Sequence, residues 1–376
     1  MPVPFRTYAP ISREQIVRNY RNVRSVVGPG VEVAAVVKAN AYGHGMAEVS
    51  RALVAEGATW LAVSSVEEGV ALRQAAIRDA RILVMAGFLP YEVEALAEYD
   101  LTPAVHSAEQ IRLADAAARK RGVPLAYHLK IDSGMGRLGT RAAASEILET
   151  ISRTTHAKLE GLMTHFASAA DYGSAQTEEQ LEAFGSIVAS LSGAGVQPAY
   201  VHAASSGAIG YGRSESWYNL VRAGLSLYGY VPRAAGNAPP QRLDVKPALA
   251  WKAKLVAVKD IPEGAPVGYG ATFRAPRPMR IGIAGAGYAD GVFQRLSNRG
   301  QMIADGRLTP ILGAVSMDLT AIDLSHTTAL APGDEVTLLG EEGGARLDAQ
   351  QIADAAGTIP YEILCAIGER VRRVYV

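Results

Sequence analysis

The stretch Val36-Val-Lys-Ala-Asn-Ala-Tyr-Gly-His-Gly45 decides how the rest of this chain is interpreted. It continues the apolar run Val33–Val37, and such a run followed by Asn and Gly predicts a buried strand that ends in a loop. Lys38 stands at this strand end. Desolvation there would lower the pKa of Lys38 and make the nucleophilic neutral amine available. The alternative is a lysine whose aliphatic carbons pack against the protein while its ammonium group extends into water. Gly43 and Gly45 allow close approach to a ligand and favour the functional interpretation.

The composition indicates a folded protein of two domains without a charged partner. The chain has 376 residues, 49% of them hydrophobic, and its 37 basic residues balance its 37 acidic ones. A large core is therefore available, and no basic run indicates a nucleic-acid partner. The single cysteine, Cys365, excludes an intrachain disulfide and a cysteine-cluster metal site, and no histidine pair has zinc-like spacing.

The N-terminal residues lack a charged head followed by a long apolar segment, so no secretory signal is expected. No apolar run approaches the length that spans a bilayer. The sequence therefore predicts a cytoplasmic protein with neither a membrane nor a nucleic-acid partner.

Residues 11–235 alternate short apolar runs with alanine-rich amphipathic segments. The expected strands are 33–37, 60–63, 82–85, 102–105, 126–131, 159–163, 200–202 and 220–227. The expected helices include 67–76, 107–119, 142–152 and 177–191. About eight strand–helix units predict an α/β fold, an N-terminal (β/α)8 barrel of the TIM type. An open doubly wound sheet is the alternative, because periodicity does not distinguish a closed sheet from an open one.

Residues 236–376 have a different sequence pattern, and the change begins in the linker-like segment 232–240. Short β-rich runs separated by Gly and Pro are expected as strands at 251–258, 280–284, 302–304 and 335–339, with a helix near 348–356. This pattern predicts a mostly-β C-terminal domain, and residues 1–10 are a candidate for pairing with it.

Several polar residues follow expected barrel strands, where reactive groups gather in such folds. Arg137 can bind a carboxylate through its fork, although a surface ion pair is the commoner role of a lone arginine. His165 at a strand end is as often a core residue as a catalytic one. Arg222 lies inside an apolar strand and needs a partner there. Small residues at Ser205 and Gly224 would expose backbone N–H groups to an anion.

The C-terminal half offers Tyr269, whose flanking glycines leave its hydroxyl approachable. Most tyrosines in such turns only pack, so this residue indicates little by itself. The segments 287–291 and 316–318 are further glycine-containing or polar motifs in the same half.

Five motifs in this order resemble the alanine racemase family, and the resemblance runs from about Ile11 to the C-terminus. They are Ala35-Val-Val-Lys-Ala-Asn-Ala-Tyr-Gly-His-Gly45, Lys130-Ile-Asp-Ser-Gly-Met-Gly-Arg-Leu-Gly139, Gly268-Tyr-Gly-Ala-Thr272, Gly287-Tyr-Ala-Asp-Gly291 and Ser316-Met-Asp318. The resemblance implies a pyridoxal 5'-phosphate enzyme with a barrel, a C-terminal β domain and a head-to-tail homodimer that shares its active sites.

The resemblance also implies roles for individual residues. Lys38 is similar to the lysine that binds the cofactor covalently and acts as one base, and Tyr269 of the partner subunit to the second base. Arg222 is similar to the arginine that faces the pyridine nitrogen, and His165 to the histidine that links it to the tyrosine. The positions that match the cofactor-phosphate site are Tyr42, Ser205, Gly224, Leu225 and Tyr361.

Other implied roles concern the substrate. Arg137 and the backbone of Met317 match groups around the substrate carboxylate. Lys130 matches a lysine that is often carbamylated in this family, which would give an anion that orients Arg137. Tyr288 matches a tyrosine at the entrance to the site, and Asp318 belongs to a supporting motif.

The implied reaction is the interconversion of L- and D-alanine by two bases, since racemisation removes a proton from one face of the α-carbon and returns it on the other. Tyr361 would narrow the pocket around a small side chain, and a broader racemase that also accepts serine is the alternative. A related decarboxylase would use a C-terminal cysteine, but the apolar context of Cys365 predicts a packed thiol. A non-catalytic cofactor carrier would be a lone barrel. The sequence does not choose between D-alanine biosynthesis and alanine breakdown.

Overall fold

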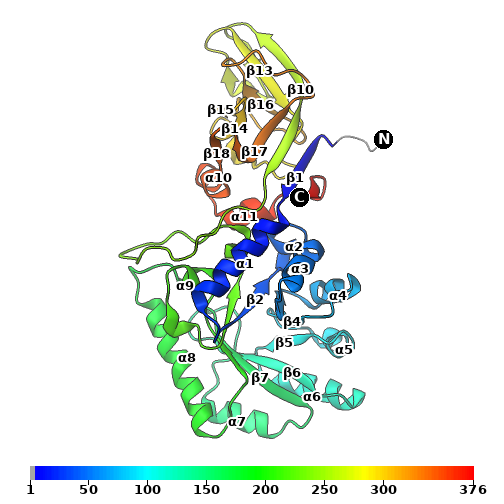
Figure 1. The fold of residues 1–376 in the computed structure, drawn as a ribbon, viewed down its shortest axis with the longest axis vertical. Helices are drawn as coiled ribbons and strands as arrows, with labels where there is room; N and C mark the ends of the chain where they lie inside the picture. Colours follow the sequence, from blue (N-terminus) through cyan, green and yellow to red (C-terminus); the bar gives the residue numbers. More distant parts are fainter. Residues whose placement is uncertain (1–4) are drawn as a thin grey trace. The chain divides into compact units, whose positions relative to one another are not determined.

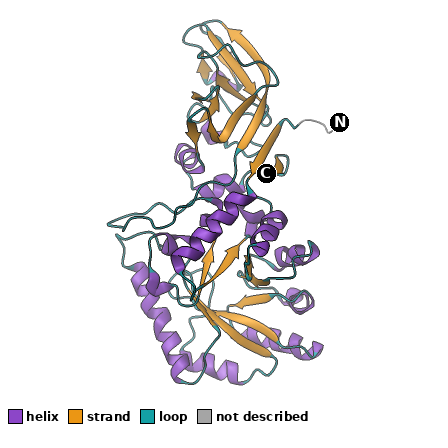
Figure 2. Cartoon of the chain, viewed as in Figure 1, coloured by secondary structure: helices purple, strands orange, loops and turns teal. Residues whose placement is uncertain are grey.

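The computed structural model describes residues 5–376, and its chain divides into two compact units. The barrel unit comprises Ile16–Ala41 and Met46–Lys246. The β unit comprises the N-terminal residues to Gln15, the short segment Tyr42–Gly45 and the C-terminal part Pro247–Val376. Residues 1–4, part of the segment considered for pairing with the C-terminal domain, lie outside the described residues. Figures 1 and 2 show the elements of each unit.

Eight parallel strands form the core of the barrel unit, in the order β8-β7-β6-β5-β4-β3-β2-β9. They are β2 (Glu32–Val36), β3 (Trp60–Val63), β4 (Arg81–Val84), β5 (Thr102–Val105), β6 (Leu125–Lys130), β7 (Ala157–Met163), β8 (Tyr200–His202) and β9 (Leu220–Ala223). A bridge between Ser205 and Arg222 links the two ends of this sheet and nearly closes it. The predicted barrel is confirmed, and the open doubly wound sheet is excluded.

Helices lie outside the parallel strands (Figure 1). They are α1 (Arg13–Val27), α3 (Met46–Ala55), α4 (Val66–Gln74), α5 (Val93–Glu98), α6 (Ala108–Arg121), α7 (Ala144–Ser152), α8 (Gln176–Gly193) and α9 (Ser206–Gly210). The side chains of Ser65 and Ser107 cap α4 and α6 by accepting backbone N–H groups of the first turn. Gly122 ends α6 in the left-handed conformation that glycine adopts without a steric penalty.

The run 220–227 is not one continuous strand. β9 ends at Ala223, and the short 3-10 turn Leu225–Tyr228 follows. The side chains of that turn are buried, which explains why the sequence is apolar there. An apolar run indicates burial and does not by itself show that the backbone is extended. The boundary expected at residues 235/236 falls in the strand-free connection 229–250.

A nine-stranded, mostly antiparallel sheet forms the β unit, which Figure 2 shows to be rich in strands. Its strands are β1 (Thr7–Ile11), β10 (Trp251–Ile261), β13 (Met279–Ala284), β14 (Gln301–Ala304), β15 (Arg307–Pro310), β16 (Thr320–Asp323), β17 (Glu335–Glu342), β18 (Ala345–Leu347) and β19 (Arg372–Tyr375). A separate ribbon pairs β11 (Pro266–Val267) with β12 (Phe273–Arg274), and the helices are α10 (Ala349–Ala356) and α11 (Pro360–Cys365). β1 lies between β10 and β19, so the N-terminal strand belongs to this sheet.

Among residues 5–376, every helix is too short or too polar to cross a lipid bilayer.

Candidate active site

Lys38 begins an unusual turn, labelled α2 (Lys38–Tyr42), directly after β2. Ala39, Asn40, Ala41 and Tyr42 all have φ between 51° and 55°, so the backbone makes one left-handed helical turn. Such a conformation costs a residue with a Cβ atom roughly 1–2 kcal/mol. Strain of this kind persists where the surroundings enforce it and is concentrated at functional sites.

Two side chains hold this turn within the barrel unit. Glu68 on α4 accepts the N–H of Ala39 at 2.7 Å and the N–H of Ser64 at 2.7 Å. The amide oxygen of Asn40 accepts the N–H of Met46 at 2.8 Å. Sequence reasoning missed Glu68, although its position three residues after the helix cap Ser65 indicates a residue that binds backbone N–H groups.

Arg222 on β9 is the most extensively bonded side chain at the strand ends. Its Nη1 donates to Nδ1 of His202 at 2.7 Å, and its Nη2 donates to Nδ1 of His165 at 3.1 Å and to the carbonyl of Thr164 at 2.7 Å. Burial lowers the pKa of Arg222 to about 10, which leaves the guanidinium charged at neutral pH. Within residues 5–376 no protein atom accepts a hydrogen bond from its Nε.

Four of the predicted cationic residues gather around His165. Burial holds the pKa of His165 well below its usual range, and the charges of Arg222, Lys130, Arg137 and Lys38 lower it further. The imidazole is therefore neutral at physiological pH. The barrel thus brings residues from the ends of β2, β6, β7 and β9 together, and their charges form a site suited to an anionic ligand.

Lys130 at the end of β6 is buried, and burial together with the charge of Arg222 lowers its pKa to about 8. His106 follows β5 and was not anticipated from the sequence. Burial and the charge of Lys130 lower the pKa of His106 to about 4, so this ring is neutral too. The only feature of the sequence that indicates His106 is its position directly after an apolar run.

The loop that carries Arg137 is organised by Asp132. The carboxylate of Asp132 accepts the N–H groups of Gly134 at 3.2 Å and Gly136 at 2.9 Å, and Nε of Arg141 at 2.8 Å. Arg137 itself is exposed. A Cβ atom at Gly139 would lie 2.5 Å from the backbone nitrogen of Asp132, which explains that glycine.

Small polar residues follow β8 and β9. Ser205 precedes α9, and the hydroxyl of Ser206 accepts the N–H groups of Gly224 and Ser226, each at 3.1 Å. The N–H of Gly224 is thus already hydrogen-bonded. Leu225 begins the following 3-10 turn, where backbone N–H groups have no partner inside the turn.

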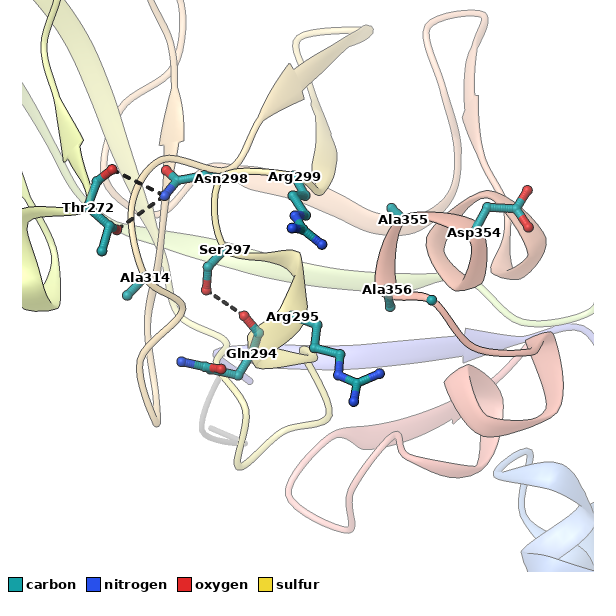
Figure 3. A pocket seen from close by; sticks show the side chains of 11 residues that line it. Thr272, Gln294, Arg295, Ser297, Asn298, Arg299, Ala314, Asp354, Ala355 and Ala356 are labelled. Carbon is teal, nitrogen blue, oxygen red and sulfur yellow. Dashed lines mark hydrogen bonds between the residues drawn. The ribbon is translucent and has the colours of Figure 1, made fainter.

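In the β unit, Tyr269 lies on the turn Tyr269–Ala271, and 78% of its surface is exposed. Gly268 and Gly270 flank it with φ of 72° and 69°. Figure 3 shows how Asn298 supports this turn by donating to the hydroxyl of Thr272 at 3.1 Å. Asn298 also accepts the N–H of Gly313 at 2.7 Å. Sequence reasoning did not find Asn298.

Tyr42 and Tyr361 both belong to the β unit, where their ring centroids are 6.0 Å apart. Burial raises the pKa of Tyr361 to about 12, so its hydroxyl remains a hydrogen-bond donor at neutral pH. A Cβ atom at Gly43 would lie 2.3 Å from the carbonyl oxygen of Leu364. The glycine after Tyr42 is therefore required by its contact with α11.

The segments 287–291 and 316–318 form one structural element of the β unit. Tyr288 donates its N–H to the carbonyl of Ser316 at 3.0 Å, and the carbonyl of Met317 accepts the N–H of Ala289 at 3.0 Å. Tyr288 and Met317 are exposed. Asp318 forms an ion pair with Arg370 at 2.8 Å.

Cys365 is exposed, so the expectation of a packed thiol is wrong. Ile363 and Leu364 of α11 are buried and account for the apolar context. Cys365 is the last residue of this helix, and it lies on a different face from Ile363.

These residues fit pyridoxal phosphate, and no group of side chains in residues 5–376 resembles a metal site. Lys38 can bind an aldehyde, the remaining donor of Arg222 can serve a ring nitrogen, and Ser205 and Leu225 can bind an anion. The chain is therefore a two-unit barrel enzyme of the pyridoxal-phosphate class. Residues 11–232 match the family model of the alanine racemase N-terminal domain, and residues 248–375 match that of the C-terminal domain. The chain belongs to the alanine racemase family, whose members are pyridoxal-phosphate-dependent isomerases.

Curated relatives agree over nearly the full length. The alanine racemase of Carboxydothermus hydrogenoformans is 40% identical over 98% of this chain and 99% of its own. Among solved structures, alanine racemase from Streptomyces lavendulae has 33% identity and a TM-score of 0.92, covering 100% of this chain and 98% of its own. Alanine racemase from Bartonella henselae with covalently bound pyridoxal phosphate has 30% identity and a TM-score of 0.88, covering 99% and 100%.

Proposed function

We propose that this protein interconverts L- and D-alanine, with Lys38 and Tyr269 as its two bases. The observation that carries the proposal is the convergence of Lys38, Lys130, Arg137 and Arg222 around the neutral His165 at the strand ends of the barrel. These positive groups suit a cofactor phosphate and a substrate carboxylate, and Lys38 supplies the amine that the cofactor requires.

The residues have separate tasks toward the cofactor. Bound pyridoxal phosphate would delocalise the electron pair that remains on the substrate α-carbon after proton loss. Lys38 would hold it covalently, and Nε of Arg222 would donate to its ring nitrogen. Because arginine only donates, this nitrogen would be an acceptor without a proton. The hydroxyl of Ser205 and the N–H of Leu225 would bind its phosphate.

Proton transfer requires groups on both faces of the α-carbon. The Nζ of Lys38 takes or returns the proton on one face, and the hydroxyl of Tyr269 does so on the other. We propose that this tyrosine comes from a second copy of the chain in a homodimer. Its support is the accessibility of Tyr269, which is 78% exposed on a glycine-flanked turn and leaves its hydroxyl available to a second copy.

A hybrid-dimer experiment tests this arrangement. Lys38→Ala and Tyr269→Phe chains, each inactive alone, are mixed under conditions that exchange subunits, and racemisation is followed by loss of optical rotation. If the sites are shared, each hybrid dimer has one intact site of its two. Because about half of the dimers in a random equal mixture are hybrids, about a quarter of wild-type activity should return. No recovery by hybrids of verified composition would contradict a shared site.

Two further features belong to the proposal. Carbamylation of Lys130 would turn a buried amine into an anion between the cations Arg222 and Arg137, and the lowered pKa of Lys130 favours this reaction. Tyr361 would limit the substrate to small side chains, while a racemase that also accepts serine is the second candidate. Cytoplasmic location stays a prediction, and D-alanine biosynthesis and alanine breakdown stay two alternatives for the role of the reaction.

A further inference from the structure

A line of buried polar side chains extends from Arg222 away from the strand ends. Nη1 of Arg222 lies 2.7 Å from Nδ1 of His202, and Nε2 of His202 lies 2.8 Å from Nδ1 of His128. Nε2 of His128 faces a carboxylate oxygen of Glu160 at 3.6 Å, beyond hydrogen-bond distance, and the other oxygen of Glu160 accepts Nη1 of Arg81 at 2.6 Å. Both imidazoles are completely buried.

The donor and acceptor roles of the side chains determine which ring nitrogen of each histidine carries a proton. Arginine only donates, so Nδ1 of His202 must be an acceptor. Burial and the charge of Arg222 hold the pKa of His202 well below its usual range, so this ring is neutral and its single proton is on Nε2. That proton is donated to Nδ1 of His128, which therefore carries its own proton on Nε2, facing Glu160.

The far end of the line is an acid that stays ionised. Burial raises the pKa of Glu160, but the contacts with His128 and Arg81 outweigh this effect and lower it to about 2. Within residues 5–376 no carboxylate lies at ion-pair distance from Arg222. Glu160 is therefore an ionised acid that faces the last imidazole of the line, and its interaction with the Nε2 proton of His128 at 3.6 Å is electrostatic.

The surroundings of the line are also specific. The ring of Trp60 lies 5.3 Å from that of His128, and the guanidinium of Arg81 lies 4.2 Å from the ring of Trp60. A Cβ atom at position 161 would lie 2.6 Å from the ring of His128, so Gly161 provides the space for this imidazole. Aromatic packing and the glycine hold His128 in the orientation that the line requires.

We propose that His202, His128 and Glu160 are positioning residues, which fix the orientation of Arg222 and the charge that it presents at the strand ends. This inference rests on the proposed function for its catalytic consequence. Its structural part, the defined tautomers and their dependence on Glu160 and His128, stands independently of the reaction.

The first measurement uses the cofactor-free chain. Nitrogen-15 NMR of histidine-labelled protein reports the protonation of each ring nitrogen, and His128→Phe and Glu160→Gln variants assign the signals. In both His128 and His202 we expect an unprotonated Nδ1 and a protonated Nε2. The signals of His202 should also shift in each variant. Protonation of Nδ1 in His202, or signals of His202 that are the same in all three proteins, would overturn the proposal.

The second measurement uses the cofactor-loaded dimer. Glu160→Gln keeps the shape and an acceptor oxygen but removes the charge, and the control Asp115→Asn alters a buried carboxylate of the barrel that lies outside the line. We expect Glu160→Gln to shift the absorbance of the bound cofactor and to lower kcat by about tenfold or more, a typical loss when a group that orients a binding residue is altered. KM should change less than twofold, and the control should move neither quantity.

The outcomes separate the two proposals. A Glu160→Gln protein that loses stability like the control, with unchanged kcat and cofactor absorbance, would show a purely structural role and overturn the relay. Wild-type protein without racemase activity would end the proposed function, whereas the NMR result would still decide whether the line is built as described.

Discussion

Nη2 of Arg222 donates a hydrogen bond of 3.1 Å to Nδ1 of His165. Because the imidazole of His165 is neutral, its remaining proton lies on Nε2, opposite the arginine. His165 can therefore donate to a further group without competing for a proton at neutral pH. The same guanidinium donates to His202, so one side chain is hydrogen-bonded to two imidazoles.

Arg222→Lys should damage both stability and catalysis. A lysine cannot reach the acceptors of Arg222 together, and each buried acceptor left without a partner costs roughly 1–3 kcal/mol. Loss of the donor to the cofactor nitrogen should also lower kcat by about a hundredfold. Urea unfolding and polarimetry measure the two effects. Wild-type kcat in a folded variant would contradict the assignment of Arg222.

Tyr269→Phe should slow proton exchange mainly for one enantiomer. The phenol serves a single face of the α-carbon, so the other face keeps Lys38 as its base. Single-turnover incorporation of deuterium from solvent, measured separately with L- and D-alanine, tests this asymmetry. Tyr91→Phe, at an exposed tyrosine of the barrel unit, is the matched control. Equal slowing for both enantiomers would count against the two-base mechanism.

Carbamylation of Lys130 should be detectable and functional. With a pKa of about 8, roughly a tenth of this amine is neutral at pH 7, far more than for an ordinary lysine. Native mass spectrometry should show the mass of one added CO2 that acid removes. Lys130→Ala should raise KM for alanine about fivefold, which corresponds to one lost hydrogen bond that orients Arg137. An unmodified lysine in fully active protein would refute the idea.

Tyr361→Asn should broaden the substrate range. Removing the ring enlarges the space beside a small side chain, and the ratio of serine to alanine turnover should rise about tenfold. Tyr361→Phe retains the ring and should leave the ratio near that of the wild type. If the asparagine variant has the wild-type ratio, Tyr361 does not select the substrate by size.

Asp115 should contribute to stability in a pH-dependent way. Burial raises its pKa, but the N–H groups of Ala157, His156 and Thr155 outweigh burial and lower it to about 2. Since the folded-state pKa lies below the unfolded-state value, the contribution is present above about pH 4 and is lost between about pH 4 and 2. We expect it to be roughly 1–2 kcal/mol.

Urea unfolding of Asp115→Asn and wild-type protein at several pH values checks this expectation. The difference in unfolding free energy should be full near pH 7 and should shrink below pH 4. A difference that is the same at pH 3 and pH 7 would show that the charge of Asp115 has no such role.

Local patterns were sufficient for several of these features. The strand endings before Lys38 and after Lys130 could be predicted, because an apolar run followed by polar and glycine residues is a short-range signal. The left-handed turn after Lys38 could not, since Ala39 and Ala41 have no sequence preference for positive φ. The apolar neighbours of Cys365 predict a packed thiol, but this residue is exposed, because residues two positions apart on a helix lie on different faces.

The sequence alone determined the strand–helix alternation, the β-rich half that follows it, the family resemblance and the residue types at the strand ends, because each depends on residues close together in the chain. That the strands close into a barrel and not an open sheet was decided by the tertiary structure. Only the tertiary structure decided that Arg222 is hydrogen-bonded to His202, that His202 is hydrogen-bonded to His128, and that Glu68 supports the turn after Lys38. These partners come from different strands and helices, and their hydrogen bonds exist only once the parallel sheet curves into a nearly closed barrel.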